Sequence, residues 1–134
     1  MKILIKEVFY INMKLIDLVK INNIFKPDMK FGDIQVGYKV MKFLKSIETD
    51  VGFYNNKLAE IAQDCAEKDG DKIKTTDNGN LVLAKDKISE WNDKIKDLAN
   101  IDIEVTLPSF KLEDFSQCNF NLEELSILES IISE

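Results

Sequence analysis

The chain has 134 residues, enough for one ordinary domain with its own core, and we expect residues 1–134 to form a single domain. With 45% hydrophobic and 31% charged residues, its composition is typical of a globular protein. It contains no His and no Arg, and its net charge is −6. These features argue against a His general base, against bidentate reading of bases by Arg, and against electrostatic attraction to nucleic acid.

The first two elements are predicted to be a short strand and a helix. The letters MKILI at residues 1–5 alternate and are rich in strand-forming residues. From Glu7 onward apolar residues recur at spacings of three and four, which predicts one face of a helix. These residues are Val8, Ile11, Leu15, Leu18 and Val19.

A sustained heptad pattern predicts one long helix from about residue 34 to residue 67, with Asp33 as its N-cap. Gly52 lies inside this segment and predicts a bend or a close contact with another helix. The seam consists of Val40, Leu44, Ile47, Val51, Tyr54, Leu58, Ile61 and Cys65.

A second helix is predicted from about residue 87 to residue 100, with Asp86 available as its cap. Its apolar positions follow the same spacing, and Trp91 on this seam is expected to belong to the core. Two helices with such seams should pack as an antiparallel hairpin. The seam residues are Ile88, Trp91, Ile95 and Leu98.

The stretch EKDGDKIKTTDNGNLVL at residues 67–83 is crowded with acids, as a calcium loop would be. No register puts Gly at the sixth position and Glu at the twelfth, so an EF-hand loop does not fit. The letters DNGN instead predict a β-hairpin in which Asn78 and Gly79 form a two-residue type I′ turn. A bound cation and a disordered tip are the alternatives, and we expect no metal and no cofactor.

The last third is predicted to contain a strand at residues 101–107, a short extended connector and a final helix. Strict alternation in IDIEVTL places four apolar side chains inward, and Pro108 closes the strand. In the final helix Asn121 and Glu124 form a capping box ahead of an apolar stripe, so the expected fold class is α+β, mostly α. The inward strand residues are Ile101, Ile103, Val105 and Leu107, and the stripe is Leu122, Leu125, Leu128, Ile131 and Ile132.

Charge is distributed unevenly. Residues 1–45 hold nine Lys, whereas no base follows Lys111 and the tail from Glu113 to Glu134 is acidic. One interpretation is a solvated surface with attraction between the two ends of the chain, and another is an acidic face for a basic partner. Charged residues interrupt the apolar opening, so we expect a cytoplasmic protein without a membrane segment, in which Cys65 and Cys118 are reduced.

The sequence offers no catalytic constellation, and we predict that the protein is not an enzyme. Ser109, Ser116 and Ser126 have no His to activate them, and no glycine-rich phosphate loop is present. The acids lie on the polar faces of predicted helices, where nothing would raise a carboxyl pKa for acid–base work.

Several segments together resemble a family of small uncharacterised proteins from tailed phages and prophages of Gram-positive bacteria. The resemblance spans nearly the whole chain and implies a phage origin and expression inside a bacterial host, but no catalytic residues. The link NNIFKPDMKFGD is longer here than in the family. The segments are EVFYINMKLIDLV, GYKVMKFLKSIE, AEKDGDKI, DNGNLVL, WNDKIKDLANIDIEVTLPSFKLEDF and LEELSILESIISE.

We therefore expect a non-enzymatic binding protein of the bacterial host cytoplasm, an anti-CRISPR-like inhibitor of a host defence or nucleic-acid-handling complex. Its partner would be a host or phage protein, without direct binding to nucleic acid or membrane. The alternative is an assembly component of the phage particle that forms homo-oligomers through its helices, and a weaker one is a small enzyme or metal protein. The predicted partner-binding residues are Glu123, Glu124, Glu129, Asp69, Asp71 and Asp77.

Overall fold

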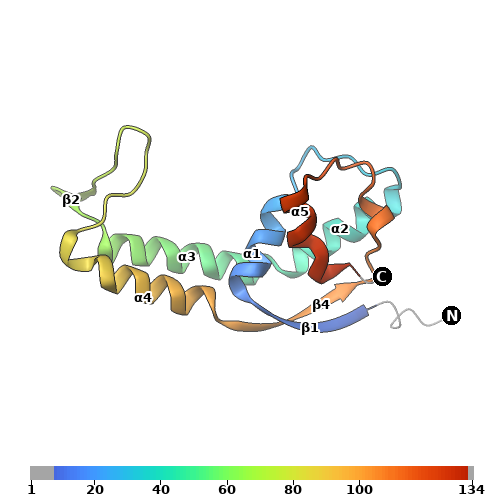
Figure 1. Cartoon of the computed structure of the whole chain (residues 1–134), viewed down its shortest axis with the longest axis horizontal. Coiled ribbons are helices and arrows are strands. Elements are labelled where there is room, and N and C mark those ends of the chain that lie inside the picture. The colour runs from blue at the N-terminus through green and yellow to red at the C-terminus, as the bar shows by residue number, and fades with distance from the viewer. Residues whose placement is uncertain (1–7, 133–134) are drawn as a thin grey trace.

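The computed structural model describes residues 8–132 as an elongated α+β molecule (Figure 1). The predicted fold class, mostly helical α+β, is confirmed at this level. Helices α3 and α4 extend toward one end, where β2 lies, while α1, α2, α5 and the β1–β4 sheet gather toward the other (Figure 1). In chain order the elements are β1 (Val8–Lys14), α1 (Leu15–Ile24), α2 (Ile34–Ser46), α3 (Glu48–Cys65), β2 (Lys68–Asp69), β3 (Lys72–Ile73), η2 (Lys85–Lys87), α4 (Ile88–Ala99), β4 (Asp102–Pro108), η3 (Leu112–Phe115), α5 (Leu122–Leu128) and η4 (Glu129–Ile131).

The helix predicted from Glu7 is wrong in its first half, because Val8–Lys14 is the strand β1. This strand pairs antiparallel with β4 from Val8 opposite Pro108 to Lys14 opposite Asp102. Half-buried Ile11 and Met13 alternate with exposed neighbours, which is the period of a strand with one buried face. Helix α1 starts only at Leu15, and the strand predicted at residues 1–5 lies outside the described residues.

The strand predicted at residues 101–107 is confirmed as β4. Val105 and Leu107 are buried and Ile103 is half-buried, as the alternation predicted. Ile101 was expected to point inward, but it precedes the strand and is exposed, while its carbonyl accepts a hydrogen bond from the Leu15 amide at 2.8 Å. The strand pair therefore also fixes where α1 begins.

The long helix predicted for residues 34–67 is two helices that meet at Ile47. The Ser46 hydroxyl donates to the Phe43 carbonyl at 2.6 Å, and the Ile47 amide reaches the same carbonyl at 3.3 Å. A hydroxyl that competes for a helix carbonyl favours a bend, and this bond lies in the last turn of α2, just before the break. The bend expected at Gly52 is absent, and a Cβ built there would meet nothing within 4 Å, so no close helix contact occurs there either.

All eight seam positions are buried or half-buried, but they face more than one partner. Val40 and Ile47 join the core that contains the β4 residues Val105 and Leu107. Tyr54 packs in a second cluster with Leu15, Val19 and Leu98 from α1 and α4. The Asp33 cap is confirmed, because its carboxylate accepts from the Gln35 amide at 2.8 Å.

Helix α4 lies alongside α3 (Figure 1). The Lys94 ammonium on α4 is 3.7 Å from the Asp64 carboxylate on α3. The cap predicted at Asp86 is wrong, because Asp86 lies inside the 3₁₀ turn η2 and α4 begins at Ile88 without a side-chain cap. Trp91 on this helix is half-buried.

Residues 66–84 reverse direction twice and form the tip of the molecule. Gly70, with φ +69°, occupies the first position of a two-residue turn between β2 and β3. The second reversal lies at DNGN as predicted, but it is not a type I′ turn, because Asn78 has no positive φ. The Gly79 amide donates to the Thr76 carbonyl and the Thr76 amide to the Asn80 carbonyl, both at 2.9 Å. This is a type I turn completed by a left-handed glycine, Gly79, with φ +82°.

Five phenylalanines hold the C-terminal segment against α1 and α2. Successive ring centroids lie 5.5 to 6.1 Å apart in tilted and edge-to-face geometry, as aromatic quadrupoles prefer. The predicted extended connector is only partly extended, since Phe110 bridges to Ile132 but Leu112–Phe115 forms a 3₁₀ turn. The phenylalanines are Phe25, Phe43, Phe110, Phe115 and Phe120.

Candidate functional site

The structure separates the predicted partner-binding residues into two groups at opposite ends of the molecule. Asp69, Asp71 and Asp77 lie on the tip, and Glu123, Glu124 and Glu129 lie on α5 and η4. Helices α3 and α4 stand between the two ends (Figure 1). These six residues therefore do not form one binding surface.

The acids of the tip are exposed but alternate with lysines. Lys74 pairs with Glu67 at 3.5 Å, and Lys68 and Lys72 lie on β2 and β3 beside Asp69 and Asp71. Because the opposite charges are interspersed, the field they make at a distance is weak. The tip is a protruding polar surface and not an acidic one.

Glu124 has a structural task. Its carboxylate accepts from the Asn121 amide at 2.9 Å, and the Asn121 side chain accepts from the Glu124 amide at 2.8 Å. This reciprocal pair is the predicted capping box, which is thereby confirmed. Glu124 is half-buried and already engaged, so it is the least suited of the three glutamates on α5 and η4 to meet a partner.

The other described acids of the C-terminal segment fall into one that is paired with a lysine and three that are exposed without such a pair. Asp114 lies 3.3 Å from the Lys39 ammonium, which joins the acidic segment to the Lys-rich first third of the chain. Glu113, Glu123 and Glu129 are exposed, and none forms an ion pair within residues 8–132. These three glutamates remain available for a basic group from outside.

Exposed leucines accompany these glutamates. Leu122 is 85% exposed and Leu112 is 52% exposed. Two adjoining hollows share Leu112 and Leu125 as lining residues, one bordered by Glu113 and Lys111 and the other by Leu122 and Glu129. We call this surface the α5 face, and it comprises the lining residues Leu112, Leu122, Leu125, Lys111, Glu113 and Glu129, together with exposed Glu123, which follows Leu122 in the sequence.

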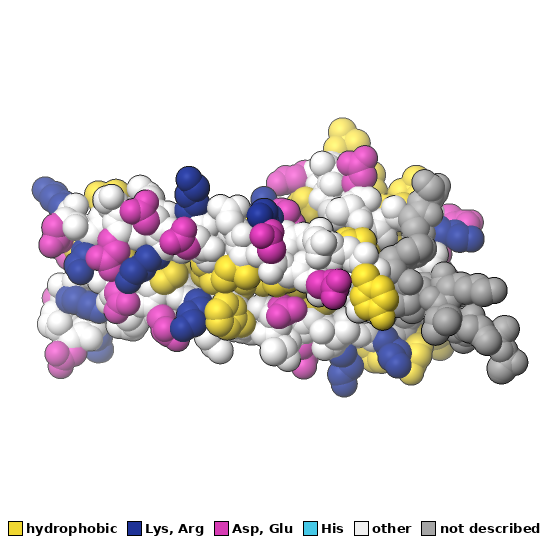
Figure 2. Space-filling model, turned by 90° about the horizontal axis from the view of Figure 1, so that it is seen from below, with side chains coloured by type: hydrophobic (Ala, Val, Ile, Leu, Met, Phe, Trp, Pro, Cys, Tyr) yellow, Lys and Arg dark blue, Asp and Glu magenta, His cyan; other side chains and the backbone are white. Residues whose placement is uncertain are grey.

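Figure 2 shows the protrusion at the α5 end of the molecule with hydrophobic side chains at its outer edge and acidic side chains beside them. Sequence reasoning missed the leucines, because Leu122 was placed in the apolar stripe of the helix. A step of three residues falls about 60° short of a full helical turn, so a stripe spaced by threes winds around the helix. Leu128 and Ile131 are buried, and Leu122 at the other end of that winding row points outward.

A thiol, a carboxylate and an ammonium meet between α3 and α4. The Lys94 ammonium lies 2.8 Å from Glu90, and this hydrogen bond lowers the pKa of Glu90 below its ordinary value, with Lys87 adding to the effect. The same bond raises the pKa of Lys94. The Cys65 sulfur lies 3.9 Å from Glu90 but is fully buried, so it is closed to any substrate. This cluster ties two helices together.

The second thiol, Cys118, is half-buried. Burial raises its pKa, so less of it is the reactive thiolate at neutral pH.

Within residues 8–132 no group of three His, Cys, Asp or Glu side chains is placed to hold a metal ion. In the same range no helix is both long and apolar enough to cross a membrane.

Comparisons with protein-family models, with curated proteins and with solved structures find no match to this chain.

Proposed function

We propose that this protein is a non-enzymatic binding protein whose α5 face covers a basic surface on another macromolecule. One observation carries the proposal: exposed Leu112 and Leu122 lie together with three glutamates that have no basic partner in the described part of the chain. An apolar centre with a charged border is the anatomy of a protein interface, in which the centre supplies affinity and the border supplies steering.

The partner that fits this face is a protein surface rich in Lys or Arg that also offers apolar side chains. Surfaces of that kind grip nucleic acid, so covering one would block a nucleic-acid-handling machine. Together with the resemblance to phage proteins, this chemistry favours an inhibitor of a host defence complex, anti-CRISPR-like in action, in the cytoplasm of a bacterial host.

The test is affinity capture from a host lysate with two matched variants. In the first, Glu123→Gln and Glu129→Gln remove charge from the α5 face but leave the Glu124 cap intact. In the second, Asp69→Asn and Asp71→Asn remove the same charge at the tip. We expect the wild-type protein and the tip variant to retain the same partner at low salt, and the α5 variant to lose it. Adding the protein to the purified partner should then inhibit that partner's activity.

Capture of the same partner by the α5 variant with undiminished yield would contradict the proposal. So would binding that does not weaken as salt is raised, because contacts between exposed charges are screened. If instead only the tip variant lost the partner, the protruding turns of residues 66–84 would be the contact surface.

The assembly alternative relied on a helix seam with apolar positions left over for a second copy. Every position of that seam is buried or half-buried against the chain itself. The seam therefore no longer supports the assembly alternative. An assembly role would have to use other surfaces.

A further inference from the structure

Another hollow on the molecule has a mainly basic border, whereas the border of the α5 face is mainly acidic. It lies between the end of α1, the following loop and α2, and its volume is about 660 Å³. We call it the Lys-rimmed groove, because Lys26 and Lys45 border it together with Asn22 and a single acid, Glu48. Its apolar lining includes Phe25, Met29, Phe31, Met41 and Leu44.

This groove continues onto an exposed apolar stripe of α2. Ile34, Tyr38 and Met41 follow one another at spacings of four and three, and they are 87%, 61% and 44% exposed. All charged residues of α2 itself are lysines, and Lys42 lies over the Tyr38 ring at 5.9 Å. Around the groove the molecule is therefore apolar with a mainly basic border, the complement of the apolar α5 face, whose border holds three glutamates and Lys111.

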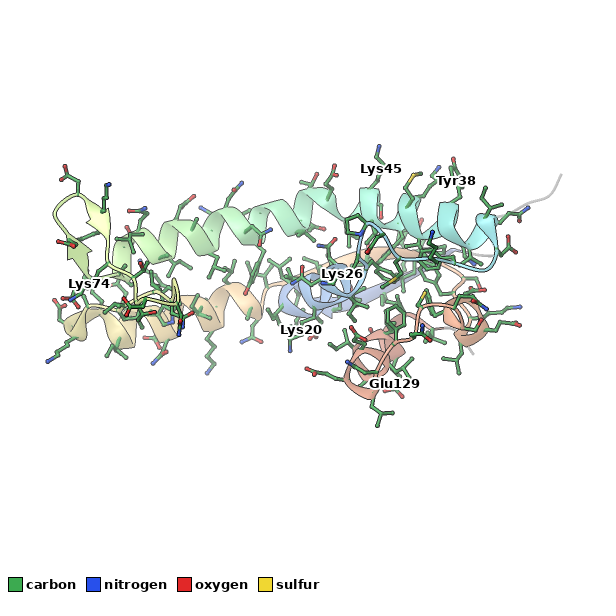
Figure 3. The ribbon with its side chains drawn as sticks, turned by 90° about the horizontal axis from the view of Figure 1, so that it is seen from above. Lys20, Lys26, Tyr38, Lys45, Lys74 and Glu129 are labelled. Carbon is green, nitrogen blue, oxygen red and sulfur yellow. The ribbon has the colours of Figure 1, made fainter. Side chains whose placement is uncertain are left out.

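One molecule cannot join these two surfaces to each other. Figure 3 shows Tyr38 and Lys45 pointing outward along α2 at one edge of the molecule, Glu129 at the opposite edge, and α1 between them. Two copies can join them, because each copy presents a protruding Leu122 beside Glu123 and a hollow bordered by Lys26 and Lys45.

We propose that the occupant of the Lys-rimmed groove is the α5 face of a second copy of this chain. Leu122 of one molecule enters the groove beside Met41 of the next, and Glu123 and Glu129 meet Lys26 and Lys45. The contact joins two different surfaces, and these face different ways, so two joined copies leave one of each free, to which further copies add in an open chain or a ring. An interface of one helix end and one groove is small, and small interfaces bind weakly and reversibly.

This inference shares the α5 face with the proposed function, and it makes self-association and partner binding mutually exclusive. At high concentration the α5 face of most copies would be covered by the groove of the next copy in a short assembly. A partner that binds the α5 face more tightly would displace that copy. The two proposals fail separately, since self-association is measured on the purified protein alone and capture on a lysate.

The experiment is sedimentation of the purified protein over a range of concentrations, with one variant for each surface. Leu122→Glu places a charge at the first position of a helix, where Glu is well tolerated, and Met41→Glu places one on exposed α2. The matched control is Ile88→Glu, which changes a 46% exposed residue at the start of α4, away from both surfaces.

We expect the mass of the wild-type protein and of the control to rise with concentration beyond that of two copies. Each single variant should stay monomeric, and an equimolar mixture of the two should form a dimer and stop there, because only one intact pair of surfaces remains. A wild-type protein that is monomeric throughout, a wild-type assembly that stops at two copies, or a mixture that stays monomeric would each overturn the proposal.

Discussion

The ammonium of Lys39 lies 3.3 Å from the carboxylate of Asp114, and it joins residues 75 positions apart in the sequence. The same ammonium donates to the Ser109 carbonyl at 2.6 Å and lies 5.3 Å from the centre of the Phe110 ring. One lysine from α2 thus contacts the segment that leads to the α5 face at three residues, Ser109, Phe110 and Asp114.

Replacing Lys39 by Met should destabilise the protein by about 1 to 3 kcal/mol, because it leaves partly buried acceptors without their charged donor. The control is Lys57→Met, which removes the exposed ion pair between Lys57 and Glu60 and should cost less than about 1 kcal/mol. Urea unfolding gives both values, and equal losses would contradict the central role of Lys39.

Two glycine substitutions should change stability in opposite directions. Gly79→Ala forces a side chain into φ +82°, which should cost about 1 kcal/mol. Gly52→Ala adds a methyl group to a helix interior where nothing lies within 4 Å, which should stabilise by up to about 1 kcal/mol. Thermal or urea unfolding of both variants checks the signs, and destabilisation by Gly52→Ala would refute the open position assigned to it.

Asn121→Ala should reduce stability by about 1 kcal/mol, because it removes one half of the capping box of α5. Asn55→Ala provides the control, since Asn55 is exposed in the interior of α3 and Ala has the higher helix propensity. Urea unfolding that shows no difference between these variants would mean that the first turn of α5 is held by other contacts.

The contribution of Lys94 to stability should depend on pH. The folded state lowers the pKa of Glu90 from 4.5, so the stability from this carboxylate is present above pH 4.5 and is lost as the pH falls through the lowered value. The folded state also raises the pKa of Lys94 from 10.5. The stability contributed by this ammonium is therefore present below pH 10.5 and is lost as the pH rises through the raised value. Urea unfolding should show a larger loss for Lys94→Met at about pH 7 than at about pH 3, and a pH-independent loss would contradict the pairing.

The two thiols should react at different rates. Cys118 is half-buried and should be modified slowly in the native protein, whereas fully buried Cys65 should react only when the structure opens. Mass spectrometry after timed exposure to a thiol reagent, with Cys118→Ser as the comparison, checks the order. Faster modification of Cys65 would mean that α3 and α4 separate readily.

Local signals in the sequence predicted local structure well. Asp33 caps α2, Asn121 and Glu124 form their box, and a glycine turns the chain at Gly79, because each depends on residues only a few positions apart. The strand β4 also follows from its own alternation. These features need no knowledge of distant partners.

The predictions of secondary structure were wrong where the structure depends on a contact with a distant segment or on a single side-chain hydrogen bond. Residues 8–14 form a strand because β4 pairs with them, although Val8 and Ile11 also fit a helical spacing. The break at Ile47 coincides with a hydroxyl hydrogen bond from Ser46 to the Phe43 carbonyl, which no periodicity reveals. The acids of the tip and of α5 could not be separated by charge counting, because only the fold puts α3 and α4 between them.

The pairing of β1 with β4 also has a consequence during synthesis. Lys14, the last residue of β1, and Pro108, the last residue of β4, are 94 residues apart, so a ribosome that adds about 5 to 20 residues per second completes β4 roughly 5 to 19 s after β1. During that interval the hydrogen-bonding edge of β1 has no strand to pair with, and a free edge recruits other chains. A released chain truncated before Asp102 should therefore aggregate or bind chaperones more than the full chain.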